Sequence, residues 1–143
     1  MKARIRQTGF GLVEVLVALL IVSIGLLGIA SLQVVALKNT GSSMERSQAV
    51  MQTYSYLDVL RANYDAAKIS GLDIPVMTCD PENLAETLVE QRKWLGELHD
   101  TLGPESCAQV ECLGDHCTIT VQWDDSRAQG GSDEQQLVTE TVL

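Results

Sequence analysis

The chain opens with a long apolar segment and continues as a mixed sequence of polar and apolar residues. Residues 10–37 hold 28 positions, and Glu14 is the only charged side chain among them. A bilayer core needs about 20 apolar residues in a helix that rises about 1.5 Å per residue, so this segment can span one. Three of the ten basic residues precede it, whereas Lys38 alone follows closely. This asymmetry predicts a cytoplasmic N-terminus and an exported remainder.

Simpler membrane signals explain this segment only in part. A secretory signal has an apolar core of about 7–15 residues before a small-residue cleavage site. Residues 28–31 imitate such a site, but the apolar run before them is too long. A plain anchor does not explain Glu14, because a carboxylate in a spanning helix is costly and normally has a partner. The alternative is an interfacial carboxylate, four positions into the helix, that reaches back to the headgroups.

Beyond residue 37 the helical pattern continues in an amphipathic form. Apolar side chains recur every three or four positions to about residue 64, which predicts a helix with one buried stripe. The stripe consists of Val50, Thr53, Leu57, Leu60 and Tyr64. Gly71 and Pro75 then predict a loop over residues 65–79.

A second helix is predicted from Asp80 to the Gly103–Pro104 pair. Asp is a good N-cap, and proline, here Pro81, is favoured at the first helical position. The apolar face of this helix holds Leu84, Leu88, Leu95, Leu98 and Leu102, and Trp94 adds to the same surface.

Three strands complete the prediction. Residues Cys117–Asp124 alternate between apolar and polar side chains, as a half-buried strand does, and they follow Cys107–Cys112 across a hairpin loop. A polar loop over residues 126–134 leads to a last strand at Gln135–Leu143. The sequence therefore predicts an α+β fold in which a small antiparallel sheet packs against the second half of the long helix.

The four cysteines all lie in the exported part. An oxidising compartment makes disulfides the expectation for a small domain. Four cysteines allow three pairings, which sequence does not settle. The favoured one joins Cys112 to Cys117 across the hairpin and leaves Cys79 for Cys107. His116 beside Cys117 raises a zinc site as an alternative, but structural zinc sites use closer cysteine pairs, so no metal is expected.

The charge balance and the motifs argue against nucleic-acid binding and catalysis. The net charge is -9, and without the first nine residues it is -12, from 7 basic and 19 acidic side chains. Binding to phosphates needs a basic surface, so no nucleic acid is expected. No nucleophile motif or phosphate-binding glycine loop occurs, and the interpretation is a non-enzyme without a cofactor. His99 and His116 are interpreted as surface residues, and Asp115, Asp124 and Asp125 as solvated rather than as a cation site.

The residues around the start of the apolar segment resemble a known signal. Thr8-Gly9-Phe10-Gly11-Leu12-Val13-Glu14-Val15-Leu16 is similar to the class III signal of type IV pilins and type II secretion pseudopilins. The resemblance implies that a membrane peptidase cuts after Gly9 and methylates the new N-terminal Phe10. It also implies that Glu14 neutralises the amine of a neighbouring subunit. Gly11 departs from the commoner Thr or Ser.

A narrower resemblance concerns the rest of the apolar segment. Residues 14–19, Ser23-Ile24-Gly25-Leu26-Leu27-Gly28 and Leu32-Gln33 resemble minor pilins of the PilV family. Major pilins generally carry a proline near the position of Ser31, and this chain has none there. The resemblance implies that Gly25 and Gly28 loosen the helix on assembly. The alternative is that they allow close helix packing, as small residues do in membranes.

The resemblance also implies an organisation and a function. Residues 1–9 would be a cleaved leader, 10–37 a transmembrane and assembly helix, and 38–143 a periplasmic pilin-like domain. The protein would cross the bacterial inner membrane once and join the pilus as a minor pilin that initiates or caps the filament. Its partners would be other minor pilins, the major pilin, a tip adhesin and the prepilin peptidase. The alternatives are a minor pseudopilin of type II secretion and a membrane-anchored periplasmic binding module.

Overall fold

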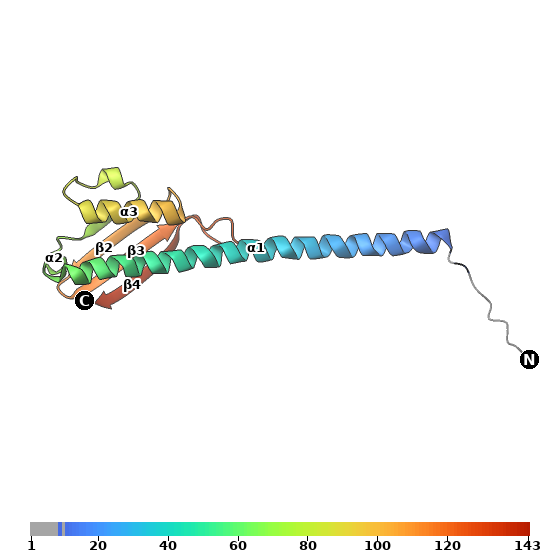
Figure 1. Ribbon diagram of the computed structural model, residues 1–143, viewed down its shortest axis with the longest axis horizontal. Coiled ribbons are helices and arrows are strands. Elements are labelled where there is room, and N and C mark those ends of the chain that lie inside the picture. The colour runs from blue at the N-terminus through green and yellow to red at the C-terminus, as the bar shows by residue number, and fades with distance from the viewer. Residues whose placement is uncertain (1–8, 10) are drawn as a thin grey trace, which may run out of the picture. The chain divides into compact units, whose positions relative to one another are not determined.

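The computed structural model describes residue 9 and residues 11–143. The elements in chain order are helix α1 (Leu12–Ala62), helix α2 (Tyr64–Lys68), strand β1 (Ile74–Thr78), a 3-10 turn (Pro81–Asn83), helix α3 (Val89–Leu102), and strands β2 (Cys107–Leu113), β3 (His116–Trp123) and β4 (Gln135–Val142) (Figure 1). The chain divides into two compact units, Met1–Leu37 and Lys38–Leu143. The second unit confirms the predicted α+β class, with the later part of α1 packed on an antiparallel sheet.

The sheet is an antiparallel meander of four strands in the order β1-β2-β3-β4. Strand β3 is central, and its side chains alternate as the sequence predicts. Cys117, Ile119, Val121 and Trp123 are buried, whereas Thr118, Thr120 and Gln122 are only partly covered. On β4 the side chains opposite this buried set are partly buried and the others are exposed. One face of the sheet therefore meets the core and the other faces outward.

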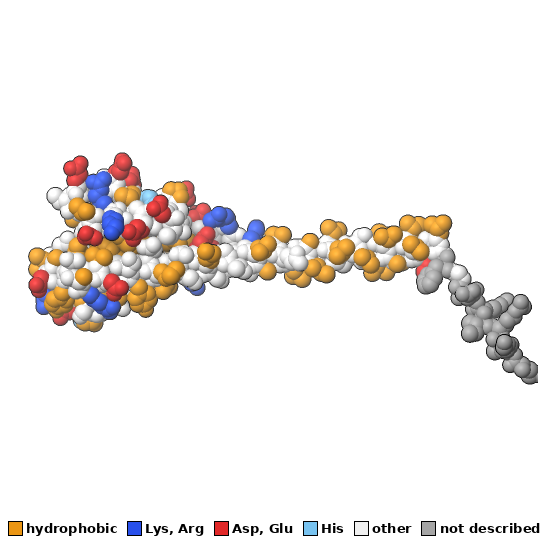
Figure 2. Space-filling model, viewed as in Figure 1, with side chains coloured by type: hydrophobic (Ala, Val, Ile, Leu, Met, Phe, Trp, Pro, Cys, Tyr) orange, Lys and Arg blue, Asp and Glu red, His pale blue; other side chains and the backbone are white. Residues whose placement is uncertain are grey.

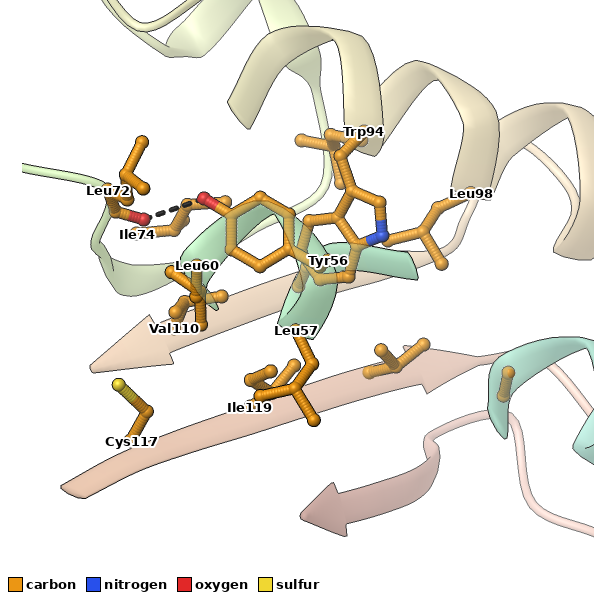
Figure 3. Close-up of a cluster of buried hydrophobic side chains, with 14 of the residues drawn as sticks. Tyr56, Leu57, Leu60, Leu72, Ile74, Trp94, Leu98, Val110, Cys117 and Ile119 are labelled. Atoms are coloured by element: carbon orange, nitrogen blue, oxygen red, sulfur yellow. Dashed lines mark hydrogen bonds between the residues drawn. The ribbon is translucent and has the colours of Figure 1, made fainter. Parts of the chain in front are cut away.

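The core of the second unit is centred on Tyr56 of α1. Its fully buried ring stacks on Trp94 of α3, with 4.2 Å between the ring centroids (Figure 3). The Tyr56 hydroxyl donates to the carbonyl oxygen of Leu72 at 2.6 Å, and Trp94 Nε1 donates to the carbonyl oxygen of Gln52 at 3.0 Å. Burial raises the pKa of the Tyr56 phenol. Both aromatic rings are thus buried with their polar atoms paired, which fixes how α1 and α3 meet.

The buried stripe of α1 differs from the predicted one at both ends. It consists of Ala49, Thr53, Tyr56, Leu57 and Leu60. Val50 is only half-buried, and Tyr64 is exposed because α1 ends at Ala62 and the chain turns at Asn63 before α2. The Tyr64 hydroxyl instead donates to Asp115 Oδ1 at 2.7 Å. The spacing of apolar residues thus predicts the middle of the buried stripe correctly. It is wrong near the point where the helix ends.

The predicted loop at residues 65–79 is wrong, since it contains α2 and β1. Strand β1 pairs with β2, with Ile74 opposite Val110 and Thr78 opposite Ala108. Pro75 is tolerated because β1 is an edge strand, where a missing N–H need not break a ladder. The Pro75 carbonyl oxygen accepts a hydrogen bond from Gln109 Nε2 at 3.2 Å.

The predicted start of the second helix is also wrong. Asp80 does act as an N-cap, because its side chain accepts from the Glu82 N–H at 2.9 Å, but it caps only the short 3-10 turn. Leu84 follows with an extended backbone, and α3 begins at Val89. Leu84 and Leu88 still pack on the core, so their apolar spacing reflects burial rather than a continuous helix.

The loop after β3 is attached to α1 by two side-chain contacts. Ser42 Oγ donates to Asp125 Oδ2 at 2.6 Å, and Arg127 pairs with Glu45 at 3.0 Å. Within the loop, the Asp125 N–H donates to the Ser132 carbonyl oxygen at 2.8 Å. A Cβ on Gly131 would overlap the Asp125 carbonyl oxygen. The loop can close in this way only with glycine at position 131.

A polar turn closes the other end of the sheet. The Cys112 N–H donates to Asp73 Oδ1 at 3.2 Å, and Ser70 Oγ donates to the Cys112 carbonyl oxygen at 3.2 Å. Burial raises the pKa of Asp73 and nearby Glu111 adds to the rise, although the hydrogen bond from the Cys112 N–H and the nearby Ser70 hydroxyl oppose it. The pKa of Asp115 shifts in the opposite direction. Hydrogen bonds from Tyr64 and Lys68 lower its pKa.

Replacing Gly131 with alanine is expected to destabilise the body. The added methyl group would overlap the Asp125 backbone, and relieving such overpacking typically costs about 1–3 kcal/mol. Chemical denaturation of the full-length chain in detergent, followed by tryptophan fluorescence, measures this change.

Gly96→Ala is the matched control. Gly96 lies within α3, and its added Cβ would meet nothing within 4 Å. Alanine at this helical position is expected to raise the free energy of unfolding by up to about 1 kcal/mol. Equal effects of the two substitutions would contradict the steric account of Gly131.

Asp73→Asn is expected to stabilise the body at pH 7. The raised pKa means that the folded state disfavours the charged carboxylate, so a neutral side chain that still accepts from Cys112 removes this cost. In the unsubstituted chain, the stability linked to this group is present below the unfolded pKa of about 3.9 and is lost as pH rises through the folded value. The gain from Asn should therefore vanish near pH 3, as denaturation at the two pH values would show.

Asp115→Asn is the control, because its expected effect on the free energy of unfolding has the opposite sign. Its lowered pKa predicts a loss of stability at pH 7 that disappears as pH falls through the folded value. The same sign for both substitutions at pH 7 would contradict the assignments.

Candidate functional site

The candidate site is the part of α1 from Leu12 to Leu37. Its mean hydropathy reaches 2.8, and it is the one helix among residue 9 and residues 11–143 that is long and apolar enough to cross a membrane. Apolar side chains are spread along the face of it that Figure 2 shows. All of its residues are exposed. A helix that is apolar all round requires lipid or other helices around it.

The hydroxyl groups of this segment are paired within the helix. Ser23 Oγ donates to the Leu19 carbonyl oxygen at 2.7 Å, and Ser31 Oγ donates to the Gly28 carbonyl oxygen at 3.0 Å. In a bilayer no water is available to pair such groups, so internal bonding lowers the cost of burying them. The two serines therefore do not prevent the helix from spanning a membrane.

Glu14 lies in the first turn of α1. The Gly11 carbonyl oxygen accepts from the N–H groups of Glu14 and Val15 at 3.0 and 3.4 Å, so the helix starts immediately before Leu12. A carboxylate in the first turn is favoured by the helix dipole. The Glu14 side chain is exposed and forms no ion pair with another described residue. It is thus available to a group outside this chain or to the chain end.

The predicted processing position falls partly outside the described residues. Gly9 is described and exposed, but Phe10 lies outside the described residues, and so does the predicted leader apart from Gly9. Cleavage after Gly9 and methylation of Phe10 therefore stay predictions.

Gly25 and Gly28 have no structural requirement within the chain. A Cβ on either would meet nothing within 4 Å, and neither has a positive φ. Glycine in a helix is less favourable than alanine by about 1 kcal/mol. Glycine at these positions must therefore serve packing against a partner helix or loosening of the helix. These are the two predicted roles, and both stay predictions.

All four cysteines are used in disulfides. Cys79 is bonded to Cys107 and Cys112 to Cys117, which is the pairing favoured above. Cys112 and Cys117 are opposite each other on β2 and β3, so their bond closes the hairpin. Among the described residues, no group of three or more His, Cys, Asp or Glu side chains is placed to hold a metal ion.

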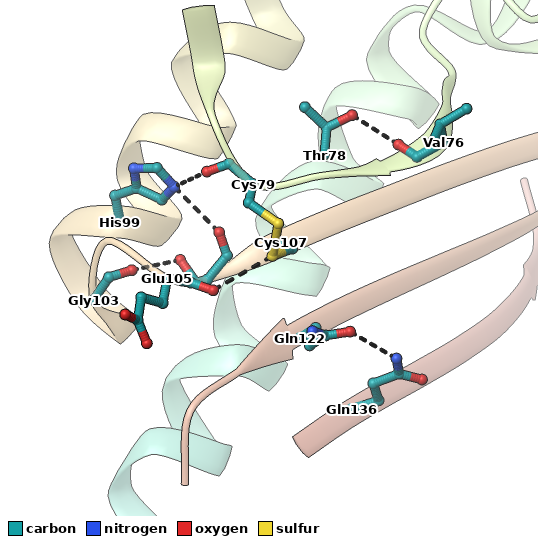
Figure 4. The surroundings of a disulfide bond; sticks show 10 residues. Val76, Thr78, Cys79, His99, Gly103, Glu105, Cys107, Gln122 and Gln136 are labelled. Carbon is teal, nitrogen blue, oxygen red and sulfur yellow. Dashed lines mark hydrogen bonds between the residues drawn. A yellow bond between two sulfur atoms is a disulfide. The ribbon is translucent and has the colours of Figure 1, made fainter. Parts of the chain in front are cut away.

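His99 has a structural contact that sequence reasoning missed. Its Nε2 lies 2.6 Å from the carbonyl oxygen of Cys79 and 3.1 Å from that of Ser106 (Figure 4). Carbonyl oxygens only accept, so Nε2 carries the proton and donates. His99 is half-buried rather than a free surface residue, and it connects α3 to both sides of the Cys79–Cys107 disulfide. Nothing in the spacing of the sequence indicates this contact.

The aspartates do not gather into one site. Asp115 accepts from Tyr64 and pairs with Lys68 at 3.2 Å, whereas Asp125 accepts from Ser42. Asp124 accepts from the Ser126 N–H at 2.8 Å. Each carboxylate thus has its own local partner.

Comparison with known protein families gives a match at the N-terminus of the chain. The family described as the prokaryotic N-terminal methylation motif matches residues 4–30, which include Gly9, Phe10 and Glu14. No curated protein and no solved structure matches the chain. The motif, together with the long apolar helix and the α+β body, supports a type IV pilin-like protein. It also fits anchoring in a membrane and processing by a prepilin peptidase.

Proposed function

We propose that this protein is a minor pilin of the PilV type, which takes part in type IV pilus assembly by initiating or capping the filament. The observation that carries the proposal is the methylation motif at residues 4–30, which overlaps an apolar segment, residues 10–37, whose only charged side chain is Glu14. The protein acts as a structural subunit, and its chemistry is that of helix packing and charge pairing.

The proposed mechanism begins with processing at the membrane. The prepilin peptidase removes residues 1–9 and leaves Phe10 with a methylated, cationic amine. Segment 10–37 holds the subunit in the inner membrane, with the body in the periplasm. As subunits assemble, Glu14 pairs with the amine of a neighbour. A buried pair of this kind specifies register more than it adds stability.

The geometry of α1 supports this mechanism. Its first 26 residues bury nothing within the chain, so their surface is free for lipid before assembly and for other pilin helices afterwards. Ser23 and Ser31 bond to their own helix and need no outside partner in either environment. Within this segment Glu14 carries the only charge, and no described residue forms an ion pair with it.

The PilV assignment and the partners rest on the finer resemblance. Ser23–Gly28 and the missing proline near Ser31 favour PilV over a major pilin. Other minor pilins, the major pilin and a tip adhesin are the proposed partners.

A minor pseudopilin of type II secretion has nearly the same N-terminal signal. In a deletion strain, loss of surface pili with normal enzyme secretion is expected, and the reverse outcome would assign the protein to secretion.

Mass spectrometry of the membrane-resident protein tests the processing step directly. We expect an N-terminus at N-methylated Phe10. Retention of Met1 on the membrane-resident protein would overturn the pilin proposal in favour of an anchored periplasmic module.

Glu14→Ala is expected to be exported but not incorporated into pili. Without the carboxylate, the neighbouring amine would be buried unpaired, and breaking a buried pair typically costs about 3–5 kcal/mol. Immunoblots of sheared pili should show at least tenfold less of the variant protein. Immunoblots of membranes should show an unchanged amount.

Two variants of the same helix control for this test. Glu14→Asp keeps the charge and should recover part of the incorporation, while Ser23→Ala removes a polar group that bonds only within its helix and should have little effect. Normal incorporation and pilus number with Glu14→Ala would count against the pairing mechanism.

A further inference from the structure

A polar pocket lies between the first turns of α1 in the second unit and the loop after β3. Its volume is about 360 Å³. The α1 side of the pocket includes Asn39, Ser42 and Arg46, and the loop side includes Asp125 and Gly130. Polar atoms form most of the lining, so the pocket suits a hydrophilic ligand.

The pocket contains one charge of each sign. Arg46 is exposed and has no ion pair or hydrogen bond within the described part of the chain. Asp125 is 7% exposed, and its Oδ2 accepts from Ser42 at 2.6 Å. No described residue donates to its Oδ1. Oδ1 is not among the fully buried side-chain atoms that lack a partner, and Asp125 lines the pocket, so a donor on a ligand can reach this oxygen. A ligand that matches both groups therefore carries an anion and a cation.

The sequence places this pocket next to the membrane segment. Asn39 follows Leu37, the end of the apolar run, by two residues in the same helix. With a rise of about 1.5 Å per residue, two residues of helix add about 3 Å. The headgroup layer of a bilayer is roughly 5–8 Å thick on each side. The pocket thus begins at the depth of the lipid headgroups.

Basic side chains of the acidic body are concentrated in the same place. Seven basic residues follow the first nine positions, and Arg46 is the one that lines the pocket, while Lys38 directly precedes Asn39 and Arg127 lies in the loop after β3. Lys and Arg side chains follow directly on the apolar stretch of α1 (Figure 2). Arg127 is paired with Glu45 on α1, which leaves Arg46 in the pocket as the cation for a ligand.

We propose that this pocket binds the headgroup of a phospholipid that carries both a phosphate and an ammonium group, as in phosphatidylethanolamine. Arg46 and the Asn39 amide bind the phosphate, and Asp125 Oδ1 accepts from the ammonium. A purely anionic headgroup would offer no donor to Asp125 Oδ1, and the carboxylate would repel it. The bound lipid holds the base of the body at the membrane surface before assembly. The proposal requires that residues 12–37 lie in a membrane, but not that the protein enters a pilus.

Titration of the full-length chain in detergent micelles tests the proposal. The probe is dihexanoyl phosphatidylethanolamine, and NMR follows the backbone amides of Gly130 in the pocket loop and Gly96 in α3. We expect a saturable shift at Gly130 and none at Gly96. Arg46→Gln should weaken binding roughly tenfold or more, since it removes a charged hydrogen-bond donor. No saturable shift at Gly130 would overturn the proposal.

Matched variants separate the pocket from general charge effects. Arg61→Gln removes an arginine from the same helix, 15 residues beyond Arg46, and should leave binding unchanged. Asn39→Asp places a carboxylate beside the phosphate and should weaken binding even if Arg46→Gln disturbs the local fold. Equal losses with Arg46→Gln and Arg61→Gln would overturn the proposed site.

Two further probes identify the source of the ligand. Dihexanoyl phosphatidylglycerol carries the phosphate without the ammonium and should bind at least tenfold more weakly. Soluble O-phosphoethanolamine should also bind more weakly, since it lacks the acyl chains that hold a lipid beside Leu37. If phosphatidylglycerol binds as tightly as phosphatidylethanolamine, the proposed role of Asp125 is wrong. If O-phosphoethanolamine binds as tightly, the assignment of the ligand as a lipid is wrong.

Discussion

The structure depends on one constraint, which is that the first half of α1 cannot cover its own apolar surface. Seventeen large apolar side chains between Leu12 and Leu37 are exposed. At about 1.5–3 kcal/mol for each fully buried side chain, the free energy available from covering them amounts to tens of kcal/mol. No element among the described residues covers them, so lipid or other helices must. Membrane anchoring and helix assembly are therefore two ways to satisfy the same requirement.

The second half of α1 satisfies a different requirement with the same backbone. From Ala49 to Leu60 only one stripe is buried, and it is covered by α3 and the sheet. Tyr56 and Trp94 fill the centre of this contact with their polar atoms bonded to backbone carbonyls. Two disulfides and the contact of His99 with Cys79 and Ser106 then hold the loops of a small body whose core alone is modest.

The sequence predicted the features that depend on local patterns. The apolar run, the middle of the α1 stripe and the alternation in β3 each follow from spacing within one element. Strand β1 was missed because Pro75 indicates a loop unless the strand is known to lie at the edge of a sheet. The start of α3 was placed too early because the burial of Leu84 imitates helical spacing. The pocket joins Asn39 and Arg46 to Asp125, about 80 positions away, and no local pattern predicts that contact.

The length of the apolar run reconciles the two interpretations of Glu14. Glu14 and Asn39 are 25 residues apart in one helix, or about 38 Å. A bilayer is about 30 Å thick in its hydrocarbon core and about 40–45 Å with its headgroups. Both polar groups can thus lie in the interfaces while the subunit waits in the membrane, where Glu14 carries little cost. Only when the helix leaves the bilayer and packs among other helices does the carboxylate become buried and require a cationic partner. On the proposed function, the interfacial carboxylate and the paired carboxylate are successive states of one residue, before and after assembly.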